Sequence, residues 1–167
     1  MKHFKLTARQ IRDFLPRIPF NTLLGVKLTR LHRDGVTIEC EMRHELTNSA
    51  GVAHGGVAAA MADVAVGMAI NRHFGGKRPL TTVEMKINYF RPVTQDRIFA
   101  RSRLLRIGST LCVGSVDLTD ADGDSIGTAL VTYMLLDARG KPPERETKPL
   151  ERGTKAQSKT RNIAARE

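Results

Sequence analysis

The sequence predicts a single α+β domain in which an antiparallel sheet of about six strands wraps around one long helix. A stretch from about Gly55 to His73 is apolar on nearly every side, which is typical of a helix buried in a core. Six other runs alternate apolar and polar residues, as half-buried strands do. Because such strands need an apolar body to cover, we expect the sheet to curl around the helix.

Each predicted element has its own local signal. The segment TARQIRDFLPRI predicts a short first helix, with Thr7 as its N-cap and its end near Pro16. The segment LLGVKLTRLHRDGVTIECEM holds two alternating runs joined by Asp34-Gly35, a strong hairpin signal. The long helix ends at the breaker GGKRP. Four strand-like runs follow, with turns at Arg91-Pro92, Gly108-Ser109 and Asp122-Gly123: LTTVEMKINYF, RIFARSRLLRI, TLCVGSVDLTD and SIGTALVTYMLLD.

We divide the chain of 167 residues into an N-terminal helical segment (1–19), one folded domain (20–138) and a C-terminal tail (139–167). The length suits one domain with a real core and is short for two. From Arg139 on, nine Lys and Arg stand against four Glu, and large apolar residues are nearly absent. Such a composition cannot bury enough surface to offset its ordering entropy, so we expect the tail to be disordered.

The formal net charge of +10 suggests a nucleic-acid partner, but its distribution weakens that interpretation, because half of the excess lies in the tail. The lack of Trp and the presence of only two Tyr argue against recognition by aromatic stacking. We expect the tail to aid solubility and to contact phosphates without specificity at low salt. A nucleic-acid-binding protein that acts through its tail stays an alternative.

The two cysteines, Cys40 and Cys112, lie far apart inside apolar runs. They are typical of small buried hydrophobic residues in a reducing compartment. No run approaches the roughly 18 apolar residues of a membrane helix, and no secretion signal precedes the first helix. We therefore expect a cytoplasmic protein that does not insert into membranes.

The sequence contains no recognisable binding motif for a metal ion or a nucleotide cofactor. The segment FGGKRP is not a phosphate loop, since Lys77 is followed by Arg78 and no upstream glycine completes the pattern. We expect no cofactor and no metal. Four histidines lack the short paired spacing of metal ligands: His32, His44, His54 and His73.

The start of the long helix carries the chemistry. Gly55 and Gly56 leave backbone N–H groups free at a helix N-terminus, where a developing oxyanion is stabilised. Asp63, a carboxylate in an otherwise apolar helix, is a candidate base or nucleophile. Eight residues separate Gly55 from Asp63, or about 12 Å along one helix axis. One chain therefore cannot bring both to one carbonyl, whereas two helices packed antiparallel across a twofold axis could.

Small residues on the Asp63 side of the helix would permit such a close approach. They are Gly56, Ala59, Ala60 and Gly67.

The spacing of Asn48, Gly51, His54-Gly55-Gly56 and Asp63 resembles the signature of PaaI-type acyl-CoA thioesterases. The later segment TTVEMKINYFRPV is also similar to the strand that follows the helix in that family, and the resemblance covers roughly residues 20–136. It implies a hotdog fold, an acyl-CoA substrate and a site shared between two subunits. A homodimer is expected, and a homotetramer stays open.

The resemblance also implies roles at matched positions. Asp63 would activate water as a general base, or attack the thioester to give a mixed anhydride. The Gly55 amide would polarise the thioester carbonyl, Asn48 and His54 would help to orient thioester or water, and Thr82 would help to hold the water. Segments that line the coenzyme A cleft in the family are matched by Arg91, Arg106, Gly108, Ser109 and Thr110.

Two further hypotheses remain within this fold. The first is a non-catalytic module that binds acyl-CoA as a sensor or carrier, against which the intact set of Asn48, His54 and Asp63 argues. The second is a hydratase, for which no Asp and His stand at suitable spacing. The sequence does not identify the acyl group of the substrate. The expected pocket walls are Met61, Val64, Met68 and Phe90.

Overall fold

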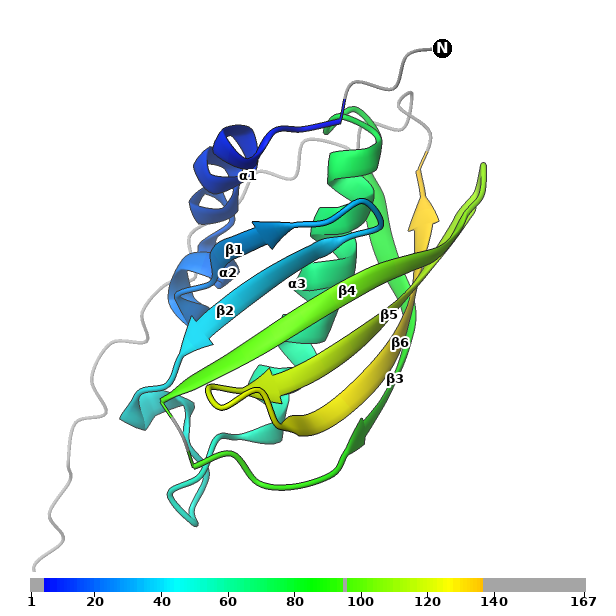
Figure 1. Cartoon of the computed structure of the whole chain (residues 1–167). Helices are drawn as coiled ribbons and strands as arrows, with labels where there is room; N and C mark the ends of the chain where they lie inside the picture. The colour runs from blue at the N-terminus through cyan, green and yellow to red at the C-terminus, as the bar shows by residue number, and fades with distance from the viewer. Residues whose placement is uncertain (1–4, 95, 137–167) are drawn as a thin grey trace, which may run out of the picture.

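A computed structural model describes residues 5–94 and 96–136 of the chain. A six-stranded antiparallel sheet, in the order β1-β2-β4-β5-β6-β3, curves around the long helix α3 (Gly55–His73). Figure 1 views the outer face of the sheet, with α3 behind it. The predicted α+β class is confirmed. The strands are β1 (Lys27–Leu31), β2 (Val36–Glu41), β3 (Leu80–Tyr89), β4 (Arg97–Ile107), β5 (Leu111–Asp120) and β6 (Ser125–Leu135).

Helix α3 has the bounds that its sequence predicts. His54 caps its N-terminus, and Arg72 and His73 in the last turn suit the negative end of the helix dipole. Its buried side chains fill the concave side of the sheet, so the helix is the centre of the core. They are Val57, Ala58, Met61, Ala62, Ala65, Val66, Met68, Ala69 and Ile70.

The N-terminal segment forms more helix than the sequence predicts. Helix α1 (Ala8–Phe14) has Thr7 as its N-cap and ends before Pro16 as expected, with a capping box between Thr7 and Gln10. A turn of 3-10 helix, η1 (Leu15–Arg17), then leads into α2 (Pro19–Leu24). The interpretation of Leu23 and Leu24 as part of the first strand is wrong.

The reason lies in the two ends of α2. Pro19 stands in its first turn, where a missing N–H costs nothing, and Gly25 ends it in the left-handed region at φ 72°. Strand β1 therefore begins only at Lys27.

Strand β3 forms one edge of the sheet and runs back along α3. It pairs with β6 on one side, and its other side has no strand partner among the described residues. Val83 in the middle of β3 is 49% exposed. The opposite edge, β1, packs against α1. The two edges therefore differ, and β3 is the open one.

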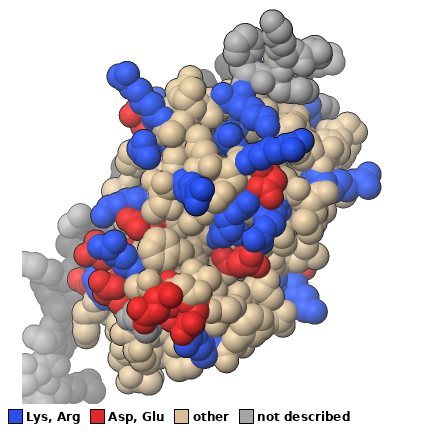
Figure 2. All heavy atoms as spheres, viewed as in Figure 1, with Lys and Arg blue, Asp and Glu red and all other residues tan. Residues whose placement is uncertain are grey.

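The outer face of the sheet mixes charges of both signs, as Figure 2 shows. Ion pairs on this face are Lys27–Glu41, Arg97–Glu39, Arg101–Asp34 and Arg103–Asp117. Interspersed charges of this kind give no continuous basic surface there, which weakens the nucleic-acid alternative for this face. The predicted tail (139–167) lies outside the described residues. The described helices include none that is long and apolar enough to cross a membrane.

Candidate active site

Asp63 lies near the middle of α3, on the side that faces β3 and β6. Its Oδ1 accepts two hydrogen bonds, from the Thr82 hydroxyl at 2.8 Å and from the Tyr133 hydroxyl at 2.8 Å. Its Oδ2 makes no hydrogen bond to the described residues. The side chain is half-buried. One carboxylate oxygen is therefore held by the fold, and the other is available to a ligand.

Tyr133 reaches Asp63 from β6 and is only 5% exposed. Its hydroxyl also lies 2.9 Å from the main-chain oxygen of Asp63. Burial, with a smaller contribution from the Asp63 charge, raises the pKa of Tyr133 above its ordinary value. The phenol consequently stays protonated and acts as a donor.

The N-terminus of α3 offers one free amide. The Nδ1 atom of His54 accepts the Gly56 N–H at 3.0 Å, so a neutral His54 ring carries its hydrogen on Nε2. The Gly55 N–H donates no hydrogen bond to the described residues, while the Gly55 carbonyl accepts the Tyr89 hydroxyl at 3.0 Å. Gly55 is thus the donor left for an anion or a polarised carbonyl at this terminus.

A pocket of about 300 Å³ opens at this end of α3. Asn48 lies in its wall, and its Oδ1 accepts the N–H groups of Ala50 and Val52 at 2.9 and 3.4 Å. That leaves the Asn48 amide nitrogen as a donor. The other lining residues are largely apolar: Val52, Ala53, His54, Gly55, Ala58, Tyr89, Phe90, Arg91, Pro92, Val93, Ile98 and Ile126.

Within one chain the pocket and the carboxylate are separate. Asp63 is not among the residues that line the pocket. The structure thus brings Asn48, His54 and Gly55 together at one place, and joins Asp63 to Thr82 at another.

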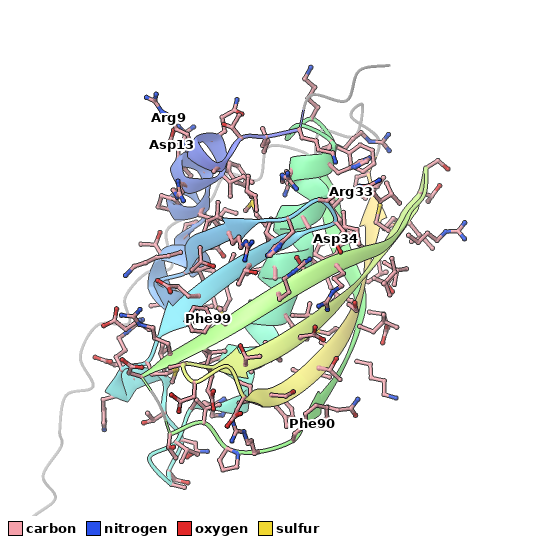
Figure 3. All side chains as sticks on the ribbon, viewed as in Figure 1. Arg9, Asp13, Arg33, Asp34, Phe90 and Phe99 are labelled. Atoms are coloured by element: carbon pink, nitrogen blue, oxygen red, sulfur yellow. The ribbon has the colours of Figure 1, made fainter. Side chains whose placement is uncertain are left out.

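Arg91, predicted to meet coenzyme A, is held by two carboxylates. It lies 2.5 Å from Asp120, which is 2% exposed, and 3.0 Å from Asp124. Arg91 follows Phe90 directly, so this ion pair ties the pocket wall to the turn between β5 and β6. Figure 3 labels Phe90 at that end of the molecule.

The other predicted coenzyme A residues lie at the far end of β4 and β5 (Figure 1). Arg106 is exposed near the end of β4, and the Gly108 N–H donates to the Leu111 carbonyl at 2.9 Å in the turn that follows. The main-chain oxygens of Ser109 and Thr110 accept hydrogen bonds from other segments. One chain therefore does not bring this turn to Arg91.

Three of the four expected pocket walls lie elsewhere. Phe90 lines the pocket, whereas Met61 and Met68 are buried in the core and Val64 is half-buried further along α3. Gly67 is also buried: it faces Tyr133 of its own sheet and is not part of an open surface. Among the described residues, no three His, Cys, Asp or Glu side chains group closely enough to hold a metal ion.

Tyr133 is the site residue that the sequence interpretation missed. Both tyrosines of the chain lie on inward positions of strands and donate their hydroxyls to α3. The buried one, Tyr133, needs a polar partner, and from Gly55 to Ile70 the helix offers only its main chain and Asp63. The sequence signal that could have identified Tyr133 was a rare tyrosine at a core-facing position of a predicted strand.

An antiparallel sheet curled around a single long helix defines the hotdog class of fold. A family model described as "Thioesterase superfamily" matches residues 50–126, which include Asp63 and every pocket-lining residue except Asn48. Over these residues the chain is similar to the thioesterase superfamily, and it is a thioester hydrolase.

Related proteins agree with this assignment. The "Medium/long-chain acyl-CoA thioesterase YigI" of Escherichia coli is 28% identical over 137 residues, covering 73% of this chain and 88% of its own length. A thioesterase family protein from Silicibacter pomeroyi has a similar structure, with a TM-score of 0.71 and 28% identity over 78% of this chain and 98% of its own.

The thioesterase HI1161 of Haemophilus influenzae has a TM-score of 0.76 and covers 85% of this chain and 99% of its own. At 18% identity it shows the fold alone.

Proposed function

We propose that the protein hydrolyses acyl-CoA thioesters to a free acid and coenzyme A, in a site shared across a homodimer. Asp63 acts as general base or nucleophile, and the Gly55 amide of the partner subunit polarises the thioester carbonyl. The observation that carries this proposal is the Asp63 carboxylate, with Oδ1 held by two hydroxyls and Oδ2 open to a ligand.

The chemistry follows from these groups. In the base mechanism, Oδ2 takes a proton from water as the water oxygen attacks the carbonyl carbon. In the nucleophile mechanism, Oδ2 attacks that carbon and the resulting anhydride is hydrolysed by water. In both, the carbonyl oxygen becomes an oxyanion near the Gly55 N–H and the dipole of α3. Collapse of the intermediate breaks the C–S bond, and coenzyme A leaves as its thiolate.

A twofold axis beside β3 would bring the two halves of the site together. The free edge of β3 is suited to pair with the same strand of a second copy, because an exposed edge strand presents unpaired N–H and C=O groups. Tyr89 contacts Gly55 and Thr82 contacts Asp63, so the two ends of β3 mark the two half-sites. Antiparallel pairing would set the Leu80 end of one strand beside the Tyr89 end of its partner.

The same arrangement would account for the scattered coenzyme A residues. The turn at Gly108–Thr110 lies at the Leu80 end of the sheet, as the hydrogen bond from Leu135 to Thr110 and the pairing of Leu80 with Leu135 indicate. Arg91 lies at the Tyr89 end. In the proposed dimer the turn of one subunit would approach the Arg91 end of the other, at the mouth of one cleft.

Thiol release from acyl-CoAs tests the proposal. Wild type and Asp63→Asn are compared on short, medium, long and aromatic acyl-CoAs with a disulfide dye. We expect release by wild type, and a loss of about a hundredfold or more in kcat for Asp63→Asn, since that change removes the base or nucleophile. An unimpaired variant would contradict the role of Asp63.

Asp13→Asn is the matched control. Asp13 is exposed on α1 and lies far from Phe90, which lines the pocket (Figure 3). The same loss of charge there should leave turnover unchanged. Ligand-induced stabilisation without thiol release would instead favour the non-catalytic module.

A further inference from the structure

Tyr133 carries a polar group into the apolar contact between α3 and the sheet. Its side chain is 5% exposed, and its neighbours at inward positions of β6, Val131 and Leu135, are buried hydrophobic residues. A hydroxyl at this depth is costly unless it is hydrogen-bonded. A phenylalanine would fill the same space without that requirement, so the hydroxyl itself calls for an explanation.

Gly67 supplies the space for this hydroxyl. It lies one turn beyond Asp63 on α3, and a Cβ at this position would lie 2.6 Å from the Tyr133 oxygen. Glycine inside a helix is unfavourable relative to alanine. Here it opens a gap in the helix surface through which the hydroxyl reaches Asp63.

The hydroxyl has one hydrogen and two acceptors within reach. The Asp63 main-chain oxygen lies at 2.9 Å and Oδ1 at 2.8 Å. An ionised carboxylate is the stronger acceptor, so the hydrogen favours Oδ1. Because burial raises the pKa of Tyr133, the phenol keeps that hydrogen.

Thr82 donates to the same oxygen from β3. Two donors from two strands on one oxygen fix the rotation of the carboxylate more tightly than either alone, and they leave Oδ2 free. Thr82 is exposed at the sheet edge, whereas Tyr133 approaches from inside the fold. The tyrosine is therefore the donor that water cannot readily replace.

We infer that Tyr133, admitted by Gly67, is a positioning residue that holds the Asp63 carboxylate with Oδ2 toward the thioester or its attacking water. The inference rests on the proposed function of Asp63. It assigns to Tyr133 an effect on turnover and none on substrate binding, because the hydroxyl meets Asp63 and not the pocket.

Tyr133→Phe tests this directly, since it removes the hydroxyl and keeps the ring. We expect kcat to fall by about tenfold with KM within about twofold, the effect of losing one hydrogen bond to a charged group. In an Asp63→Asn background the same change should cost nothing further, measured in single turnovers. Gly67→Ala, which pushes the hydroxyl away, should reproduce the loss in kcat.

Two variants separate this role from a structural one. Thr82→Ser keeps a donor to Oδ1 and should retain most of the activity, whereas Thr82→Val combined with Tyr133→Phe should lose more than either change alone. Thr128→Val is the control, because the Thr128 hydroxyl donates to the Val116 carbonyl and meets neither the pocket nor Asp63. It should leave kcat unchanged.

Several outcomes would overturn the inference: an equal loss in both backgrounds, a change confined to KM, or a lower melting temperature with unchanged kcat. If wild type releases no thiol from any acyl-CoA, the proposed function fails, and a crystal structure of Tyr133→Phe then decides this inference by itself. We expect the Asp63 carboxylate to occupy more than one rotamer there. A single rotamer, unmoved from that of wild type, would overturn it.

Discussion

The Gly55 amide is a main-chain group, yet its position allows it to be removed by mutation. Gly55 is the first residue of α3, where proline is tolerated because its missing N–H has no intrahelical partner. His54 before it is extended at φ −66° and ψ 132°, which suits a residue that precedes proline. A Cβ at Gly55 would lie 3.4 Å from the Tyr89 ring, so a side chain fits.

Gly55→Pro and Gly55→Ala therefore form a matched pair. Both add a Cβ, but only proline deletes the N–H. We expect Gly55→Pro to lower kcat by about a hundredfold or more, as loss of an oxyanion donor does, and Gly55→Ala to stay within a fewfold of wild type. Steady-state kinetics on the best acyl-CoA, with circular dichroism to verify helix content, would show this. Equal losses in both variants would point to crowding and remove the amide from the mechanism.

The two cysteines should not react with thiol reagents in the folded protein. Cys40 and Cys112 are both 0% exposed, and burial raises the pKa of each thiol above its usual value. The thiolate is the reactive form, so the native protein should not react with a disulfide dye at neutral pH. Dye titration should count no thiols in buffer and two in denaturant. Rapid labelling of the native protein would show that the core around β2 or β5 opens.

At the scale of elements, the pocket wall is held by one buried carboxylate. Oδ1 of Asp120 accepts the N–H groups of Asp122 and Asp124, while Oδ2 pairs with Arg91. Asp120→Asn keeps an oxygen for the turn and loses the charge that binds Arg91. We expect a loss of about 2 kcal/mol in unfolding free energy and a raised KM, because the segment that contains Phe90 loosens.

Asp124→Asn is the control for that change. Asp124 also pairs with Arg91, but its side chain is 67% exposed. An exposed ion pair contributes about 0.5 kcal/mol or less to the unfolding free energy. This variant should therefore have the unfolding free energy and the KM of wild type. Denaturant unfolding and KM measured on both variants would test the difference. If the two variants behave alike, the buried ion pair does not hold the pocket wall.

Elements with strong local patterns were predictable from the sequence. The bounds of α3 and β4 match the prediction, because a continuous apolar run in α3 and an alternating run in β4 both end at turn residues. Helix α2 was not predicted, since six residues carry no periodicity and no side chain caps its start. The residues of the candidate site also differ in how far the sequence could predict them. The cluster at Asn48–Gly55 is local, whereas the contact between Tyr133 and Asp63 spans 70 residues and depends on strand register that no local pattern encodes.

At the scale of the whole molecule, Asp63 and the Gly55 amide form one site only if two copies meet. The surface of α3 supports this arrangement: Ala59, Ala60, Asp63 and Val64 are half-buried, and Asp63 contacts Thr82 on the edge strand β3. Small residues next to an open strand edge allow a second copy to approach closely. Each site would then contain Gly55 of one subunit and the partner subunit's Asp63.

Heterodimers of two inactive variants provide the decisive experiment. Subunits carrying Asp63→Asn and Gly55→Pro are co-expressed with different affinity tags, and the mixed dimer is isolated through both tags. A shared site predicts one intact site and one doubly damaged site, so the mixed dimer should show about half the wild-type kcat per dimer. Both homodimers are the controls and should stay inactive. If each site lay within one chain, every site in the mixed dimer would carry one defect, and no activity would return.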